Sequence, residues 1–309
     1  MSTATHPPQG PRLLGVALVA FSAVAFSAKA ILIKLAYRHG VDAVTLLALR
    51  MIFSAPLFLA VAWWASRGGR SPRLSRGDWR AVAFLGIVGY YLASLFDFLG
   101  LQYITAALER LVLFLYPTFV VLISAAFLGR VIVGRDVAAL ALSYTGIALV
   151  FVNDLSVQQD NVLLGAFWVA LSALAYAVYL VGNERMVRKL GSVQFASLAG
   201  IVSCAAVVAH FLVVREASLL WTQPAPVYGL TLLMAVLSTV LPVVLMSVGI
   251  RLIGSSHASM VGTVGPVATI FLGFAFLDEP ITLVQLAGAA LVLAGVIAIS
   301  AAKPPPRAS

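Results

Sequence analysis

Residues 100–151 read GLQYITAALERLVLFLYPTFVVLISAAFLGRVIVGRDVAALALSYTGIALVF, and residues 249–300 read GIRLIGSSHASMVGTVGPVATIFLGFAFLDEPITLVQLAGAALVLAGVIAIS. The two runs align without a gap, and the same residue types open them, interrupt them and recur near their ends: Gly100 and Gly249, Pro117 and Pro266, Gly146 and Gly295. Leu13-Leu14-Gly15 likewise matches Leu163-Leu164-Gly165. Self-similarity at a fixed offset is the signature of an internal repeat. The chain is predicted to be one unit written twice, at 13–152 and 163–302, between short tails at 1–12 and 303–309.

The composition indicates a membrane protein. Of its 309 residues, 62% are hydrophobic and 10% are charged, whereas roughly a quarter of the residues of soluble proteins are charged. Continuous runs rich in Leu and Ala favour helices and exclude the alternating pattern of a β-barrel. Each run is long enough to cross about 30 Å of hydrocarbon as a helix. We therefore expect an all-α protein with ten transmembrane helices, near 13–37, 43–65, 80–101, 105–128, 136–152, 163–182, 193–214, 226–250, 255–277 and 281–302.

The number of spans and the basic residues predict the topology. Five spans in each unit is an odd number, so the second unit crosses the membrane in the opposite direction, and inverted repeats place a binding site at their interface. Fourteen Lys and Arg residues fall on the side of the termini and three on the other, namely Lys34, Arg38 and Arg215. The positive-inside rule then places both termini in the cytoplasm and the protein in the cell (inner) membrane. This topology accounts for the net charge of +9 without a nucleic-acid partner; anionic lipid or nucleic acid bound by the arginines at 67–80 is the alternative.

Several kinds of chemistry have no residues to carry them. The chain has no phosphate-binding G-x-x-x-x-G-K-[ST] motif and no G-x-S-x-G nucleophile elbow. No His, Cys and carboxylate cluster has metal-ligand spacing, and the single cysteine, Cys204, is predicted to be core filler. We predict no catalytic residues, no cofactor and no metal. A membrane-embedded enzyme acting on lipid remains as an alternative.

Charged residues within the predicted spans are costly and need partners. Five occur, all in the first unit: Lys29, Arg50, Asp97, Glu109 and Arg110. We predict a paired network with a gating role, in which Lys29 pairs first with Asp97 and second with Glu109. The alternative is an ion-pair cluster that only stabilises helix packing.

Polar and aromatic residues form stripes at helical spacing. Ser22, Phe26 and Lys29 lie at i, i+4 and i+7. The offset of 150 residues that relates Leu13 to Leu163 maps them onto Ser172, Tyr176 and Tyr179, with Trp168 one turn earlier. Further polar residues lie on the third span, at Tyr90 and Ser94, and on the eighth span, at Ser238 and Thr239. A polar stripe on an apolar span faces a cavity or another helix rather than lipid. We predict that these residues line a substrate cavity; core packing is the alternative.

Glycine and proline interrupt the fourth and ninth spans at matched places. Pro117 corresponds to Pro266, and Gly262 and Gly265 flank the second proline. Proline within a helix removes a backbone hydrogen bond and kinks the helix, and matched Gly/Pro interruptions point to the site or hinge of a transporter. We predict hinges at these four residues, with a static kink that improves packing as the alternative.

A longer motif follows the second interruption. Gly262-Thr263-Val264-Gly265-Pro266-Val267 precedes Leu277-Asp278-Glu279-Pro280, Gln285, Gly288 and Gly295-Val296. This spacing resembles the closing signature of the EamA-type repeat of the drug/metabolite transporter superfamily. The first copy departs from it, with Gly129-Arg130-Val131 where the second has Asp278-Glu279-Pro280.

The resemblance covers essentially the whole chain. It implies ten helices in a 5+5 inverted arrangement that export metabolites, amino acids or toxic compounds. Members of this length favour the amino-acid exporter branch, which includes aromatic amino-acid and methyl-viologen exporters; a drug or toxic-cation exporter is the alternative. The predicted function is therefore secondary export of a small-molecule substrate, with amino acids favoured, across the lipid bilayer by alternating access.

Overall fold

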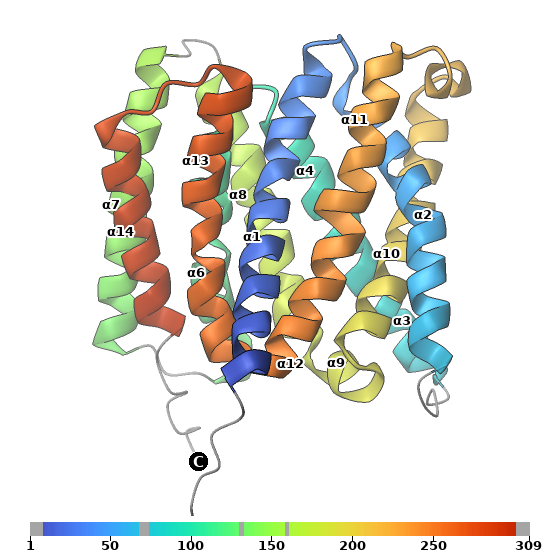
Figure 1. The fold of residues 1–309 in the computed structure, drawn as a ribbon, viewed down its shortest axis with the longest axis horizontal. Helices are drawn as coiled ribbons and strands as arrows, with labels where there is room; N and C mark the ends of the chain where they lie inside the picture. Colours follow the sequence, from blue (N-terminus) through green and yellow to red (C-terminus); the bar gives the residue numbers. More distant parts are fainter. Residues whose placement is uncertain (1–8, 68–73, 130–132, 158–160, 301–309) are drawn as a thin grey trace, which may run out of the picture.

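The computed structural model describes residues 9–67, 74–129, 133–157 and 161–300. Within these ranges the chain is helical, without strands, and the helices stand side by side in one bundle (Figure 1). Seven helical stretches are long and apolar enough to cross a membrane, and Val137–Asn153, Val264–Leu277 and Leu283–Ile297 are shorter apolar helices. The prediction of an all-α membrane protein is confirmed.

The helices overlap the predicted spans. The first half contains α1 (Gln9–Tyr37), α2 (Ala43–Arg67), α3 (Arg76–Gly86), η1 (Ile87–Leu92), α4 (Ala93–Gly100), α5 (Ala106–Leu113), α6 (Tyr116–Leu128) and α7 (Gly134–Val157). The second half contains α8 (Val162–Gly182), α9 (Glu184–Leu190), α10 (Ser192–Val214), η2 (Ala217–Leu220), α11 (Ala225–Ala235), η3 (Val236–Val240), α12 (Leu241–Gly262), α13 (Val264–Leu277) and α14 (Leu283–Ser300). α12 runs from the eighth predicted span into the ninth with a non-helical turn at Gly254 inside it. The predicted tail at 303–309 and residues 1–8 lie outside the described residues, and residues 9–12 begin α1.

Two of the helical spans contain π-helical turns. η1 follows α3 and η3 follows α11, and they begin at Ile87 and Val236, which are equivalent positions in the two units. Within η3 the Thr239 hydroxyl donates to the carbonyl of Met234, 3.0 Å away. A π-helical turn widens a helix and is frequently found at functional sites.

The predicted interruptions are breaks between helices rather than bends within them. α5 ends at Leu113 and α6 begins at Tyr116, so Pro117 lies in the first turn of α6. α12 ends at Gly262 and α13 begins at Val264, which places Pro266 in the first turn of α13. A proline there removes no helical hydrogen bond, because the first N–H groups of a helix have no partner within it.

Helices from the two halves approach closely at glycines. α4 packs on α8, and a Cβ added to Gly100 would lie 2.8 Å from the carbonyl oxygen of Gly165. α1 packs on α12 in the same way, where a Cβ on Gly249 would lie 3.1 Å from the carbonyl oxygen of Gly15. Small residues let backbones meet in lipid, where helix association depends on close packing.

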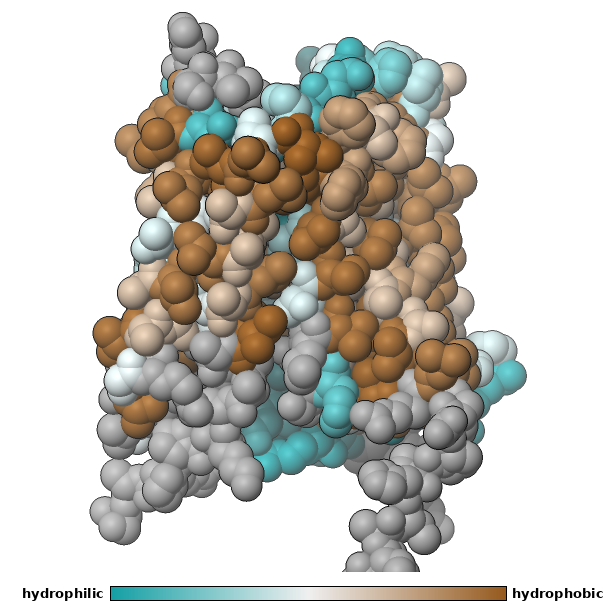
Figure 2. Space-filling model, turned by 60° about the vertical axis from the view of Figure 1, so that its left-hand side comes forward, coloured by the Kyte–Doolittle hydropathy of each residue, from teal (hydrophilic) through white to brown (hydrophobic). Residues whose placement is uncertain are grey.

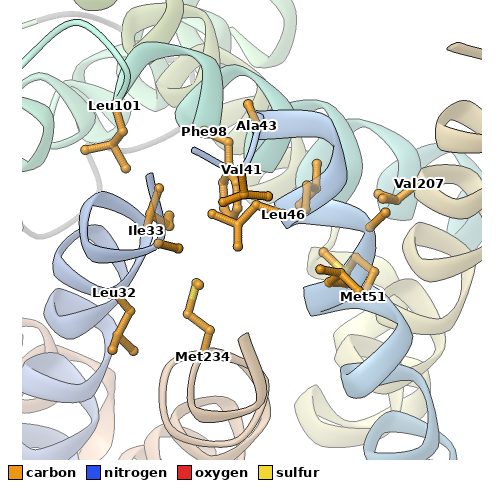
Figure 3. Close-up of a cluster of buried hydrophobic side chains, with 14 of the residues drawn as sticks. Leu32, Ile33, Val41, Ala43, Leu46, Met51, Phe98, Leu101, Val207 and Met234 are labelled. Carbon is orange, nitrogen blue, oxygen red and sulfur yellow. The ribbon is translucent and has the colours of Figure 1, made fainter. Parts of the chain in front are cut away.

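Buried apolar side chains pack between the helices, and further apolar side chains cover the outside of the bundle. α1, α2, α4, α10 and α11 contribute Ile33, Leu46, Phe98, Val207 and Met234, in that order, to one buried cluster (Figure 3). Figure 2 shows a flank that is predominantly hydrophobic between hydrophilic ends. An apolar outer surface with polar ends suits a multi-pass protein in a bilayer.

Candidate functional site

A cavity of about 450 Å³ lies between the two halves of the bundle. It is lined by residues from α1, α2, α4, α5, α6, α8, α12, α13 and α14 and from both π-helical turns. Its wall reaches Ile250 and Ala258 of α12, which flank the turn at Gly254. That turn lies beside the start of α1, because Gly15 contacts Gly249 and Ile253. The cavity therefore extends from the middle of the bundle toward the end where α1 begins, which is the lower end in Figure 1.

A buried charge cluster forms one side of this cavity. The Lys29 ammonium lies 2.5 Å from Oδ2 of Asp97 and 3.9 Å from Oε1 of Glu109. Nε of Arg110 lies 3.9 Å from Oε2 of Glu109, and its Nη2 donates to the carbonyl of Phe26 at 2.8 Å. The predicted pairing of Lys29, with Asp97 first and Glu109 second, is confirmed. Both carboxylates are essentially unexposed, and neither lines the cavity, whereas Lys29 and Arg110 do.

Arg50 of α2 joins the cavity wall without an ion pair to any described carboxylate. Its Nη2 donates to the Ser94 hydroxyl at 2.8 Å, and its guanidinium carbon lies 4.9 Å from the centre of the Phe98 ring. Its Nε is buried and has no hydrogen-bond partner. The neighbouring carboxylate, Asp97, is held by Lys29.

Most residues predicted to line the cavity do so in the structure. The lining includes Phe26, Lys29, Tyr90, Ser94, Ser172, Tyr176, Ser238 and Thr239, together with Arg50, Arg110, Gly262 and Gly265. The π-helical turns present Tyr90 and Thr239, which occupy equivalent positions in the two units.

Three residues predicted to line the cavity do not reach it. The Ser22 hydroxyl donates to the carbonyl of Leu18 on its own helix, at 2.7 Å. The Trp168 ring stacks on Phe96 with 5.5 Å between ring centres. Tyr179 is buried behind Tyr176, one turn beyond the cavity wall. Helical spacing identified the correct helices, but a stripe spanning two turns also includes residues that pack against neighbouring helices.

Comparison with known proteins agrees with the geometry. The model of the EamA-like transporter family matches residues 13–152 and again residues 163–301. The chain belongs to this family. It is 31% identical over 280 residues to the Bacillus subtilis (strain 168) protein named Uncharacterized transporter YcbK, covering 89% of this chain and 88% of that protein.

An Archaeoglobus fulgidus protein named Uncharacterized transporter is 26% identical over 286 residues, covering 92% and 95% of the two chains. One solved crystal structure has a TM-score of 0.62 at 17% identity and covers 94% of this chain and 96% of its own, which shows a shared fold. The family and these relatives are transporters rather than enzymes. This EamA-like protein is therefore a membrane transporter.

At the end of the EamA-like transporter opposite to the start of α1, one residue has a role that the sequence did not reveal. Glu279, between α13 and α14, accepts hydrogen bonds from the backbone N–H of Ala106, at 3.0 and 3.2 Å from its two oxygens. Its Oε1 also lies 3.7 Å from the Lys34 ammonium. A carboxylate at a helix N-terminus satisfies free N–H groups and the helix dipole. The Asp278-Glu279-Pro280 motif indicated that Glu279 is important, but the helix whose N-terminus it binds, α5, is remote from it in sequence.

Neighbouring tyrosines of α8 give a first prediction. Tyr176 lines the cavity, whereas Tyr179 packs edge-on against Tyr90 and stacks on Phe195. We expect Tyr176→Ala to lower transport several-fold with little loss of stability. Tyr179→Ala should instead destabilise the fold by about 3–5 kcal/mol, because it leaves a cavity in packed side chains. Transport in proteoliposomes and thermal unfolding of each variant would check this, and equal effects on both measurements would contradict it.

Proposed function

We propose that this EamA-like transporter is a secondary exporter in the cell (inner) membrane. It carries a small metabolite out of the cytoplasm by alternating access, with amino acids as the favoured class. The observation that carries the proposal is a cavity between two matched halves that extends toward one end of the bundle, while an ion pair joins α1 to the loop after α13 at the other end.

An inverted repeat of five and five crossings is supported by features that recur at equivalent positions. The π-helical turns begin at Ile87 and Val236, and the breaks before Pro117 and Pro266 follow them. The contacts recur as well, since α1 packs on α12 as α8 packs on α4. When two copies make equivalent contacts, each copy can adopt the conformation of the other. This swap of conformations is the basis of alternating access in transporters built from inverted repeats.

The two ends of the bundle differ in a way that suits an exporter awaiting substrate. The basic residues favour cytoplasmic termini, and the cavity extends toward that end, where α1 begins. At the other end Lys34 pairs with Glu279, and Arg38 donates to the carbonyl of Leu277 at 2.7 Å. These contacts join α1 to the loop after α13, so they must break for the cavity to open outward.

The test is efflux from sealed proteoliposomes that contain the purified protein. We expect saturable, protein-dependent release of one or more preloaded amino acids, reduced several-fold in the Tyr176→Ala variant. Protein-free liposomes serve as the control. Release of toxic cations but of no amino acid would favour the drug-exporter alternative. Substrate turnover in detergent, without a sealed compartment, would contradict transport as the activity.

The matched prolines lead to a prediction about the transport cycle. Gly262 and Gly265 lie on either side of the break before α13, and glycines hold a helix weakly. We expect Pro266→Ala to lower transport several-fold and to shift the accessibility of introduced cysteines toward one face. Pro117→Ala should shift it weakly toward the other face. Cys204 is buried and should be replaced by Ser before cysteines are introduced.

Transport at the rate of the unsubstituted protein, with unchanged accessibility in both variants, would show that the prolines only support packing. A matched control is Pro56→Ala, because Pro56 lies within α2 and away from both breaks. Its accessibility pattern should remain that of the parent protein.

A further inference from the structure

The charge on the cavity wall is one-sided. Lys29, Arg50 and Arg110 all line the cavity, and none of its described lining residues is an Asp or a Glu. The two carboxylates of the cluster, Asp97 and Glu109, are 1% and 0% exposed and lie behind the wall. Three cations against two carboxylates leave the cluster with an excess of one positive charge. A molecule in the cavity therefore meets positive charge and no accessible carboxylate in the described wall.

Of the three cations in the described wall, Arg50 is the one that is free to bind a ligand. Lys29 is engaged by Asp97, and Arg110 donates to Phe26 and to the Thr269 hydroxyl. Among the described residues, Arg50 has only the Ser94 hydroxyl as a hydrogen-bond acceptor, although it is only 4% exposed. A buried charged group with unfilled donors is costly. A guanidinium with unused N–H groups can bind a carboxylate through two parallel hydrogen bonds.

The rest of the wall suits an apolar or aromatic body. Five rings from four parts of the chain line the cavity: Phe26, Tyr90, Phe114, Tyr116 and Tyr176. The rings of Tyr116 and Tyr176 meet edge to face, with centres 5.2 Å apart and planes at 80°. Aromatic rings bind one another in such edge-to-face and offset arrangements. The volume of about 450 Å³ is that of a pocket for a small organic molecule.

We propose that the substrate is a small organic carboxylate with an aromatic or apolar body, and that its carboxylate binds Arg50. The aromatic or apolar body of the substrate lies among the aromatic side chains of α1, η1, α6 and α8. A positive charge on the substrate finds no carboxylate partner in the described wall and is repelled by Lys29, Arg50 and Arg110. This inference rests on the proposed transport function and specifies what the same cavity recognises. It argues against a toxic cation as the substrate.

The test compares three probes that share a phenyl ring on a two-carbon chain: 3-phenylpropionate, L-phenylalanine and 2-phenylethylamine. The first carries only a carboxylate, the second a carboxylate and an ammonium, and the third only an ammonium. Binding to the purified full-length protein at pH 7 is measured by the rise in its thermal unfolding midpoint, since a ligand of the native state stabilises it by mass action. We expect the first two to stabilise the protein, the acid at least as strongly as the amino acid, and the amine to have no effect. Stabilisation by the amine equal to that by the acid, or by none of the three, would overturn the proposal.

Substitutions then assign the carboxylate to Arg50. Arg50→Gln should weaken binding of 3-phenylpropionate by about 10- to 100-fold, the value of hydrogen bonds to a charged group. Arg50→Lys keeps the charge without the planar fork and should weaken it less. Arg215→Gln is the matched control, because Arg215 is a half-exposed arginine that pairs with Asp42 outside the cavity. Unchanged binding in both Arg50 variants would overturn the assignment; should Arg50→Gln not fold, the lysine variant and the probe series on the unsubstituted protein decide.

Efflux measurements separate this inference from the transport function on which it rests. If 3-phenylpropionate binds through Arg50 but no probe or amino acid leaves loaded vesicles, the proposed export fails and the recognition of carboxylates stands. If an amine or a cation is exported while the acid does not bind, the proposed recognition fails and export stands.

Discussion

Lys29→Met is expected to destabilise the protein by about 3–5 kcal/mol, because removing one partner of a buried ion pair leaves an uncompensated charge. Among the described residues, Lys29 is the cation within 4 Å of Asp97, and Asp97 is 1% exposed. Asp97→Asn should cost less, because the Lys29 ammonium still has Glu109 at 3.9 Å. Unfolding of the purified variants by denaturant would measure both differences.

The double variant Lys29→Met with Asp97→Asn is expected to be more stable than Lys29→Met alone, because it removes both charges of the pair. Arg188→Met is a suitable control. Its ion pair with Glu184 within α9 is exposed, 74% and 72% on the two side chains, and exposed pairs contribute at most about 1 kcal/mol. If the two single losses within the cluster simply add in the double variant, the pair is not coupled.

Gly100→Ala is the second substitution with a large expected effect. Its Cβ would lie 2.5 Å from Cγ2 of Val169 and 2.8 Å from the carbonyl oxygen of Gly165, so α4 and α8 must separate. Overpacking of this kind costs about 1–3 kcal/mol. Gly249→Ala should have a similar effect, because the equivalent contact of α12 with Gly15 and Val19 is as close. Thermal unfolding midpoints and the yield of folded protein would record the loss.

Gly229→Ala provides the matched control for these glycine substitutions. Gly229 lies within α11, and an added Cβ would meet no atom within 4 Å. Alanine there should stabilise the helix by about 0.5–1 kcal/mol, because glycine loses more conformational freedom on folding. Equal destabilisation by all three substitutions would show that close contact between helices is not the reason for the glycines.

The Lys29–Asp97 pair is a part of the site that could be predicted from the sequence. An embedded cation needs a carboxylate, and few were available, so the Lys29–Asp97 pair and its second partner Glu109 were predictable. Arg50 was predicted only as a member of the network. The structure showed that this guanidinium has Ser94 and the Phe98 ring beside it but no carboxylate within ion-pair distance among the described residues. Which cation remains unpaired depends on distances between helices, and these distances are not encoded by local spacing.

The sequence by itself determined the helical class, the repeat and the helices that carry the cavity residues, because apolar length and matched Gly and Pro positions are local properties of the chain. Tertiary structure decided which side chains face the cavity: it buries Tyr179 and includes Tyr176, three residues earlier on the same helix. It also introduced the π-helical turns at Ile87 and Val236 and brought Glu279 to the N-terminus of α5. The physical reason is that the rotation of each helix about its axis is determined by the packing of its neighbours, through contacts between residues far apart in sequence.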